Sequence, residues 1–176
     1  MPGVNCQPIL EAFSPIKVIK KGEYLIQPGW RAHFMAFIQE GTFRVFYLND
    51  KEEEVTTWFS FQGMFVTDLL CFYKDVPAVF YVEAIEDSKV ICLQKATLER
   101  LYIAQPEYRE FGRNFAEGGM VMVMERMVSL QTKSAEERYR ELLDRPIFLQ
   151  KIPLKYLASY LGITDTSLSR IRKNIS

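Results

Sequence analysis

Hydrophobic and polar residues alternate in short runs through the first half of the chain, between about residues 13 and 94. Thr42–Leu48, for example, runs into Asn49-Asp50-Lys51, a typical hairpin turn, and Val55–Phe59 returns from it. The runs that we interpret as strands are Ile16–Ile19, Tyr24–Ile26, Phe34–Ile38, Thr42–Leu48, Val55–Phe59, Val79–Ile85 and Lys89–Leu93. Many short strands at this spacing predict an antiparallel β jelly roll or barrel.

The pattern becomes helical after this region. Ala96–Tyr102 predicts a short helix, and Pro106 suits the first turn of the next one, because its missing N–H would be unpaired there anyway. This second helix continues to about Gln131, although Gly118-Gly119 interrupts it. Apolar residues recur along it at spacings of 4, 3, 4 and 3, namely at Ala116, Met120, Val123, Met127 and Leu130. The spacing indicates a seam between the helices of a dimer, the alternative being a helix buried on its own domain.

A helix-turn-helix pattern follows toward the C-terminus. Ser134-Ala135-Glu136-Glu137 is a capping box that starts one helix. Further on, Pro153 opens a helix, the small Ala158 suits a helix crossing, and Gly162 suits a turn that needs positive φ. Thr164 can then cap a second helix through its hydroxyl. This arrangement is typical of a helix-turn-helix, whose second helix enters the major groove of DNA.

The second helix of this pattern turns Leu168 and Ile171 inward and leaves hydroxyl and basic residues exposed. The residues that we predict to contact DNA are Lys155, Thr164, Thr166, Ser167, Ser169, Arg170, Arg172 and Lys173. Arg170 is expected to reach a base edge, because a guanidinium can donate two hydrogen bonds to guanine. The hydroxyl residues are expected to assist at bases or phosphates, and the other basic residues to meet phosphates. The alternative is an ordinary helical hairpin with a basic surface.

The distribution of charge agrees with a nucleic-acid partner. The chain has 22 basic and 22 acidic residues, so its formal net charge is zero. Residues 1–131 nevertheless carry 13 basic against 17 acidic residues, whereas residues 132–176 carry nine against five. A basic segment behind a mildly acidic body favours a polyanionic partner at the C-terminal end.

The composition argues against an enzyme. A single histidine, His33, cannot supply the ligand sets or acid–base groups of common active sites, so we expect no catalytic residue, metal or cofactor. A haem bound through His33 is the weaker alternative. Cys6, Cys71 and Cys92 have no close pairing, which fits a reducing compartment. The N-terminus lacks the form of a signal peptide and no apolar run could span a bilayer, so we expect a cytoplasmic protein without membrane contact.

Five segments carry a resemblance to a known family: Lys20–Ile26, Phe37–Gly41, Phe61–Val66, Ser134–Tyr139 and Leu154–Thr164. On these segments the chain resembles the CRP/FNR transcription regulators, in the divergent branch common in Bacteroidetes-like genomes. The resemblance implies an α+β fold with a cyclic-nucleotide-binding-like effector domain in residues 1–105. It further implies a dimerisation helix in residues 106–131 and a helix-turn-helix DNA-binding domain in residues 132–176.

The chain departs from this family at the phosphate cassette. Cyclic-nucleotide-binding members carry Gly-Glu for the ribose hydroxyl and then an Arg, followed by Ser or Thr, for the cyclic phosphate. Those positions fall here on Thr67-Asp68 and Ala78-Val79. Without the guanidinium a buried phosphate loses its charge-assisted contact, so we expect no binding of cAMP. The predicted effector pocket is apolar and aromatic, with Asp68 as its main charged group, and is lined by Phe65, Thr67, Asp68, Ala78, Val79 and Tyr81.

The sequence thus predicts a homodimeric, sequence-specific regulator of transcription that binds double-stranded DNA. RNA polymerase is a candidate partner, and the effector is an unknown small molecule other than cAMP. The recognition helix also departs from the family, because Asp165-Thr166 stands where relatives carry Arg or Val and then Glu. The alternative function is therefore a ligand-binding and dimerisation module whose degenerate helix-turn-helix no longer binds DNA.

Overall fold

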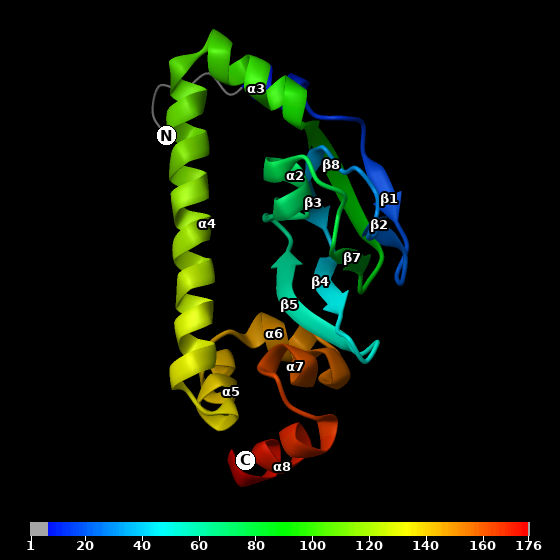
Figure 1. Cartoon of the computed structure of the whole chain (residues 1–176), viewed down its shortest axis with the longest axis vertical. Helices are drawn as coiled ribbons and strands as arrows, with labels where there is room; N and C mark the ends of the chain where they lie inside the picture. Colours follow the sequence, from blue (N-terminus) through cyan, green and yellow to red (C-terminus); the bar gives the residue numbers. More distant parts are fainter. Residues whose placement is uncertain (1–6, 176) are drawn as a thin grey trace. The chain divides into compact units, whose positions relative to one another are not determined.

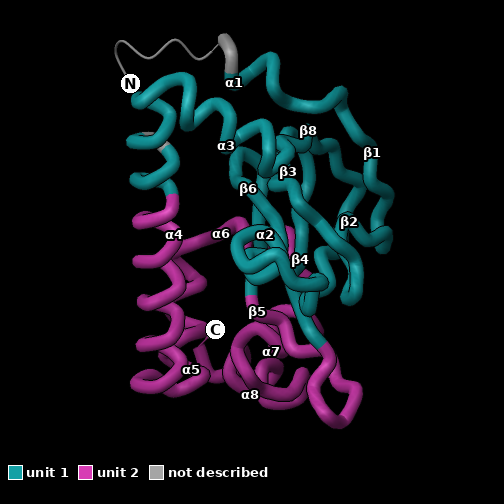
Figure 2. The backbone as a smooth tube through the Cα atoms, turned by 45° about the horizontal axis from the view of Figure 1, so that its top comes forward, with its two compact units in different colours: residues 1–47, 58–115 teal, residues 48–57, 116–176 magenta. Residues whose placement is uncertain are grey.

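The structure is a computed structural model that describes residues 7–175. Its contacts divide the chain into two compact units, which Figure 2 colours separately. Unit 1 contains the residues up to 47 and residues 58–115, and unit 2 contains residues 48–57 and the residues from 116 onward. The tip of one β-hairpin, residues 48–57, thus belongs with the C-terminal helices.

Unit 1 is built on two four-stranded antiparallel sheets, with strand orders β1-β8-β3-β6 and β2-β7-β4-β5 (Figure 1). The strands are β1 Lys17–Ile19, β2 Tyr24–Ile26, β3 Phe34–Glu40, β4 Thr42–Leu48, β5 Glu54–Phe61, β6 Phe65–Val66, β7 Tyr81–Ala84 and β8 Ser88–Gln94. Most neighbours in a sheet are far apart in sequence, as when Phe37 pairs with Ile91, whereas β4 and β5 form a hairpin. This connectivity confirms the predicted α+β jelly-roll fold.

The two sheets share one apolar core, which period-two alternation produces. Ile38 and Val90 from one sheet and Val45 and Val82 from the other are buried in the same cluster. Burial of each such side chain contributes about 1.5–3 kcal/mol. The β3–β4 turn adds a steric constraint, because Gly41 has φ +102° and a Cβ there would lie 2.0 Å from the Oγ of Ser88.

The helices bear out the helical part of the sequence pattern. They are α1 Gln7–Glu11, α2 Leu69–Lys74, α3 Lys95–Ala104, α4 Pro106–Thr132, α5 Ala135–Leu143, α6 Pro146–Lys151, α7 Leu154–Leu161 and α8 Asp165–Ile175. α4 continues through Gly118-Gly119 without a break. The sequence pattern did not predict α1, α2 or α6. None of the helices within residues 7–175 is both long enough and apolar enough to cross a membrane.

Unit 2 has its own small core, in which α5 contacts α6 and α7, and α7 contacts α8. Leu157, Ala158 and Leu161 of α7 are buried there together with Leu168 of α8. Ala158 is fully buried, which agrees with its predicted place at a helix crossing. α7 begins after Pro153, which stands as the residue before the first turn.

Candidate functional site

The turn between α7 and α8 has the geometry that the sequence predicts. Gly162 ends α7 in the left-handed region, at φ 71° and ψ 32°. Its N–H donates to the carbonyl of Ser159, and the N–H of Ile163 donates to the carbonyl of Ala158, both at 3.0 Å. These two bonds form a Schellman motif, which favours glycine because a Cβ is strained at positive φ.

α8 starts at the cap that Thr164 provides. The Oγ1 of Thr164 accepts a hydrogen bond from the N–H of Ser167 at 3.2 Å and donates to the Oγ of Ser167 at 3.0 Å. Leu168, four residues after the cap, is fully buried and anchors the helix. Two of the predicted DNA-contacting hydroxyls are therefore engaged in starting the helix.

Four of the remaining predicted contacts lie on one exposed face of α8. Thr166, Ser169, Arg170 and Lys173 are exposed and spaced three, four and seven residues apart, which places them on the same side of a helix. Arg172 is exposed as well, and Lys155 is exposed on α7. The N-terminus of α8 adds backbone N–H groups to this face, where phosphate is favoured.

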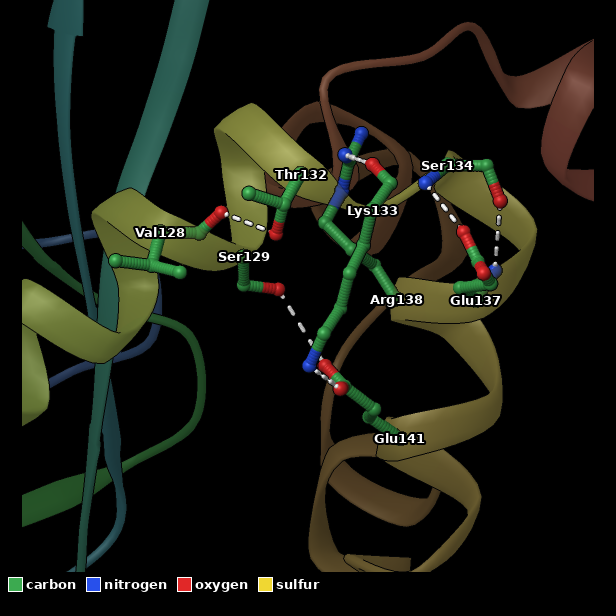
Figure 3. Close-up of polar contacts among 8 residues, drawn as sticks. All are labelled: Val128, Ser129, Thr132, Lys133, Ser134, Glu137, Arg138 and Glu141. Atoms are coloured by element: carbon green, nitrogen blue, oxygen red, sulfur yellow. Dashed lines mark hydrogen bonds and ion pairs between the residues drawn. The ribbon is translucent and has the colours of Figure 1, made fainter.

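The junction that leads from α4 into this region is tied by polar contacts (Figure 3). The capping box is present, since the N–H of Ser134 donates to Glu137 Oε2 at 2.7 Å and the N–H of Glu137 donates to Ser134 Oγ at 3.2 Å. Hydrogen bonds from the backbone N–H and the side chain of Ser134 lower the pKa of the Glu137 carboxyl. Lys133 pairs with Glu141, and Ser129 Oγ donates to the same carboxylate.

The predicted dimer seam is an exposed apolar stripe on α4. Its five members, Ala116, Met120, Val123, Met127 and Leu130, are all exposed in the single chain. Met120 is the most open of the large ones, at 64%. A row of apolar side chains left in water is unusual for a monomer.

Asp68 occupies the centre of the cassette in unit 1. It caps α2, and its Oδ1 accepts from the N–H groups of Leu70 and Cys71 at 2.9 and 3.1 Å. Its Oδ2 accepts from the N–H groups of Val79 and Phe80 at 2.8 and 3.0 Å. The side chain is fully buried, and the four bonds fill the acceptor positions of a carboxylate. Asp68 is thus engaged within the protein and is not a charged group open to a ligand.

This arrangement is an anion site filled by the chain itself. The positive end of α2 and two further N–H groups converge on one buried negative charge. Ala78 is buried, and its N–H donates to the carbonyl of Trp30 at 2.8 Å, while Val79 is 46% exposed. The structure therefore brings Asp68, Ala78 and Val79 together.

The other predicted pocket residues have different surroundings. Thr67 donates its hydroxyl to the carbonyl of Phe34 at 2.8 Å. Phe65 contacts a group of phenyl rings, namely those of Phe13, Phe37 and Phe115. Tyr81 stacks on Phe46 at 4.7 Å, and its neighbour Val82 belongs to the core between the sheets. Because side chains alternate along a strand, Tyr81 points to the other face of β7 from Val82.

A buried ion pair was missing from the sequence prediction. Arg44 is fully buried on β4, its Nη1 lies 3.3 Å from Glu83 Oε2, and its guanidinium covers the ring of Phe46 at 4.1 Å. In an alternating strand Arg44 takes a polar, outward position, so the pattern alone indicates solvent. His33 lies 3.3 Å from Asp75 through its Nε2. Within residues 7–175 no cluster of three or more His, Cys, Asp or Glu side chains is placed to hold a metal.

Comparison with known proteins identifies the family. Residues 16–105, just over half of the chain, match the model of the cyclic nucleotide-binding domain, so the chain belongs to that family. No curated protein sequence matches the chain.

Solved structures share the fold over most of the chain, including the helices that follow the family domain. FixK2 from Bradyrhizobium japonicum superposes with a TM-score of 0.78 at 18% identity, covering 92% of this chain and 83% of that one. CooA from Carboxydothermus hydrogenoformans superposes with a TM-score of 0.71 at 17% identity, covering 95% of this chain and 78% of that one. A crp/fnr-family protein from Eubacterium rectale superposes with a TM-score of 0.73 at 16% identity, covering 96% of this chain and 81% of that one.

Proposed function

We propose that the protein is a sequence-specific, DNA-binding regulator of transcription that acts as a homodimer and does not respond to cAMP. The observation that carries the proposal is the α7–Gly162–α8 motif, with its positive-φ glycine, its Thr164 cap and the exposed basic face of α8. The fold shared with FixK2 and CooA supports the same class. RNA polymerase remains a predicted partner.

Two features of the chain support DNA binding, one through the preference for sequence and the other through affinity. Arg170 is exposed one turn into α8, where a recognition helix reaches base edges. Lys155 and Lys173 are exposed on α7 and α8, where they can meet the phosphates on either side. Phosphate contacts supply affinity, and the base contact supplies the preference for sequence.

Dimerisation through the seam on α4 would give this binding its geometry. A two-fold axis pairs the seam with the same seam of a second copy. It also duplicates α8, so that two recognition helices face the DNA about one turn, roughly 34 Å, apart. The expected operator is therefore a two-fold symmetric site.

The buried Asp68 carboxylate supports independence from cAMP. A cyclic phosphate would have to compete with a covalently attached anion for the same backbone N–H groups. Ala78 offers no guanidinium to compensate the desolvation of the phosphate. Other proteins of this fold bind or respond to different ligands, since CLP from Xanthomonas campestris is responsive to c-di-GMP and CprK forms a complex with OCPA.

The proposal is tested by comparing Arg170→Ala with Lys173→Ala on a duplex selected by the wild-type protein and on a scrambled duplex. Arg170→Ala is expected to weaken binding to the selected duplex by about 1–3 kcal/mol and to relax the preference at one base pair. Lys173→Ala is expected to weaken binding to both duplexes alike. It should also lower the slope of log affinity against log salt concentration by about one. Asn174→Ala, an exposed neutral neighbour on α8, is the matched control and should change neither.

Two results would contradict the proposal. If Arg170→Ala weakened binding to both duplexes equally, Arg170 would contact phosphate only. If the folded wild-type dimer selected no duplex, the helix-turn-helix would be degenerate, and the ligand-binding module would be the better description. Calorimetric titration with cAMP and cGMP tests the effector separately, with no binding expected at sub-millimolar ligand.

A further inference from the structure

The C-terminal end of α7 is attached to three other parts of unit 2, namely α4, α5 and the tip of the β4–β5 hairpin. The last four carbonyls of a helix, here those of residues 158–161, have no partner within the helix. The Schellman turn takes the first two, because the N–H groups of Ile163 and Gly162 donate to Ala158 and Ser159. The carbonyls of Tyr160 and Leu161 instead accept hydrogen bonds from arginine side chains.

Arg126 of α4 binds the first of these two carbonyls. Its Nη2 donates to the carbonyl oxygen of Tyr160, and its guanidinium lies 3.7 Å from the centre of the Tyr160 ring. The plane and charge of a guanidinium suit both contacts, which an ammonium group would not reproduce. Burial lowers the pKa of Arg126 from its ordinary value and raises that of Tyr160.

Arg138 of α5 binds the second carbonyl. Its Nη2 donates to Leu161 at 2.8 Å, and its Nη1 donates to the carbonyl of Lys133 at the α4–α5 junction (Figure 3). Both arginines bring positive charge to the negative end of α7, where it is favoured. The Nε atoms of Arg126 and Arg138 are buried without a hydrogen-bond partner among the described residues.

Ser159 provides a third attachment, to the tip of the β4–β5 hairpin. Its Oγ accepts from the N–H of Thr56 at 2.9 Å and donates to the carbonyl of Glu54 at 2.9 Å. Three consecutive residues of α7 are thus bound to the hairpin tip, to α4 and to α5. We call Arg126, Arg138 and Ser159 together the α7 clamp.

We infer that the α7 clamp is a positioning device for DNA binding, which fixes the direction of α8 relative to the dimer helix α4. The inference rests on the proposed function. The clamp acts directly before Gly162, the turn from which α8 departs, so a change in α7 is passed on to α8. Arg126 lies within the span of the dimer seam, between Val123 and Met127, so it connects the seam to the recognition helix in one step.

Arg126→Gln is the principal test, and Arg140→Gln is its matched control. Arg140 is an arginine of α5 that pairs with Glu136 and belongs to the exposed side of that helix. On a duplex selected by the wild-type protein, Arg126→Gln is expected to lose at least tenfold in affinity while its affinity for a scrambled duplex changes less than about twofold. It should also tolerate half-site spacings that the wild type rejects, because α8 is no longer held in one direction. Arg140→Gln should behave as the wild type.

Hydrogen exchange without DNA gives a second, independent measurement. In Arg126→Gln the amides of α7 and α8 are expected to exchange faster, while those of the β-sandwich keep wild-type rates. Ser159→Ala should produce the same change in direction and a smaller one in size, since it frees only the hairpin tip.

The outcomes separate the clamp from the proposed function. Wild-type spacing preference and wild-type exchange in Arg126→Gln would overturn the inference. An equal loss of affinity of Arg126→Gln for the selected and the scrambled duplex would also overturn the inference, because Arg126 would then support folding only. If the wild-type protein selects no duplex, the proposed function fails, and faster exchange confined to α7 and α8 still decides whether the clamp holds the recognition helix.

Discussion

Replacement of Asp68 by alanine tests the self-filled anion site most sharply. The variant removes one buried carboxylate and leaves four backbone N–H groups without their acceptor. Loss of a helix cap costs about 0.5–2 kcal/mol, which covers the two groups at the start of α2. Each further buried N–H left unpaired costs about 1–3 kcal/mol, and two such groups lie at Val79 and Phe80.

Water limits the total, because Val79 is 46% exposed and its N–H can be rehydrated once the carboxylate has gone. We therefore expect Asp68→Ala to lower the free energy of unfolding of unit 1 by about 3–5 kcal/mol. Asp68→Asn keeps one oxygen for the cap but turns an amide NH₂ toward the other N–H groups, so about half of that loss is expected.

Urea unfolding followed by tryptophan fluorescence measures the effect, since Trp30 and Trp58 both lie in unit 1. With an m-value of about 2 kcal/mol/M, a loss of about 4 kcal/mol lowers the midpoint by ~2 M. Asp87→Ala is the control, because Asp87 is an exposed acid whose pairing with Lys20 is solvated, and it should leave the midpoint nearly unchanged. A shift below about 0.5 M for Asp68→Ala would refute the assigned role of the carboxylate.

Three further predictions concern other parts of the chain. Met127→Lys puts a charge into the dimer seam and should shift sedimentation at micromolar concentration toward monomer, whereas Glu125→Gln, outside the seam, should not. Gly41→Ala should cost about 1–3 kcal/mol in thermal unfolding, because the added Cβ meets Ser88 at a positive φ. The lowered pKa of Glu137 means that its stabilising effect on α5 is complete above the unfolded-state pKa and disappears as the pH falls through the lower folded value. An NMR titration should place the midpoint of Glu137 below that of an unfolded peptide.

Much of the fold could be predicted because local rules determine it. β4 matches its predicted bounds, since an alternating run ends at a turn. Gly162 and Thr164 could be assigned because positive φ and helix capping depend on residues close in sequence. β6, by contrast, has two residues, too few to show a period, and α6 follows the end that was predicted for α5.

The missed parts of the site depend on contacts between distant residues. In the sequence Asp68 looks like a carboxylate that is available to a ligand. Only the approach of residues 79 and 80, whose N–H groups donate to it, makes it a buried acceptor. Arg126 reads as one charge between apolar seam residues, and its partner Tyr160 lies 34 positions further along the chain. Patterns with a period of two or of 3.6 carry no information about such pairs.

Selection from a pool of random DNA duplexes tests the central claim most directly. The folded wild-type protein is incubated with the pool at near-physiological salt, and the bound duplexes are amplified and sequenced over several rounds. The proposed function predicts enrichment of a two-fold symmetric site whose half-sites lie about one helical turn, roughly 34 Å, apart. Bound duplexes that remain as random as the starting pool would contradict it.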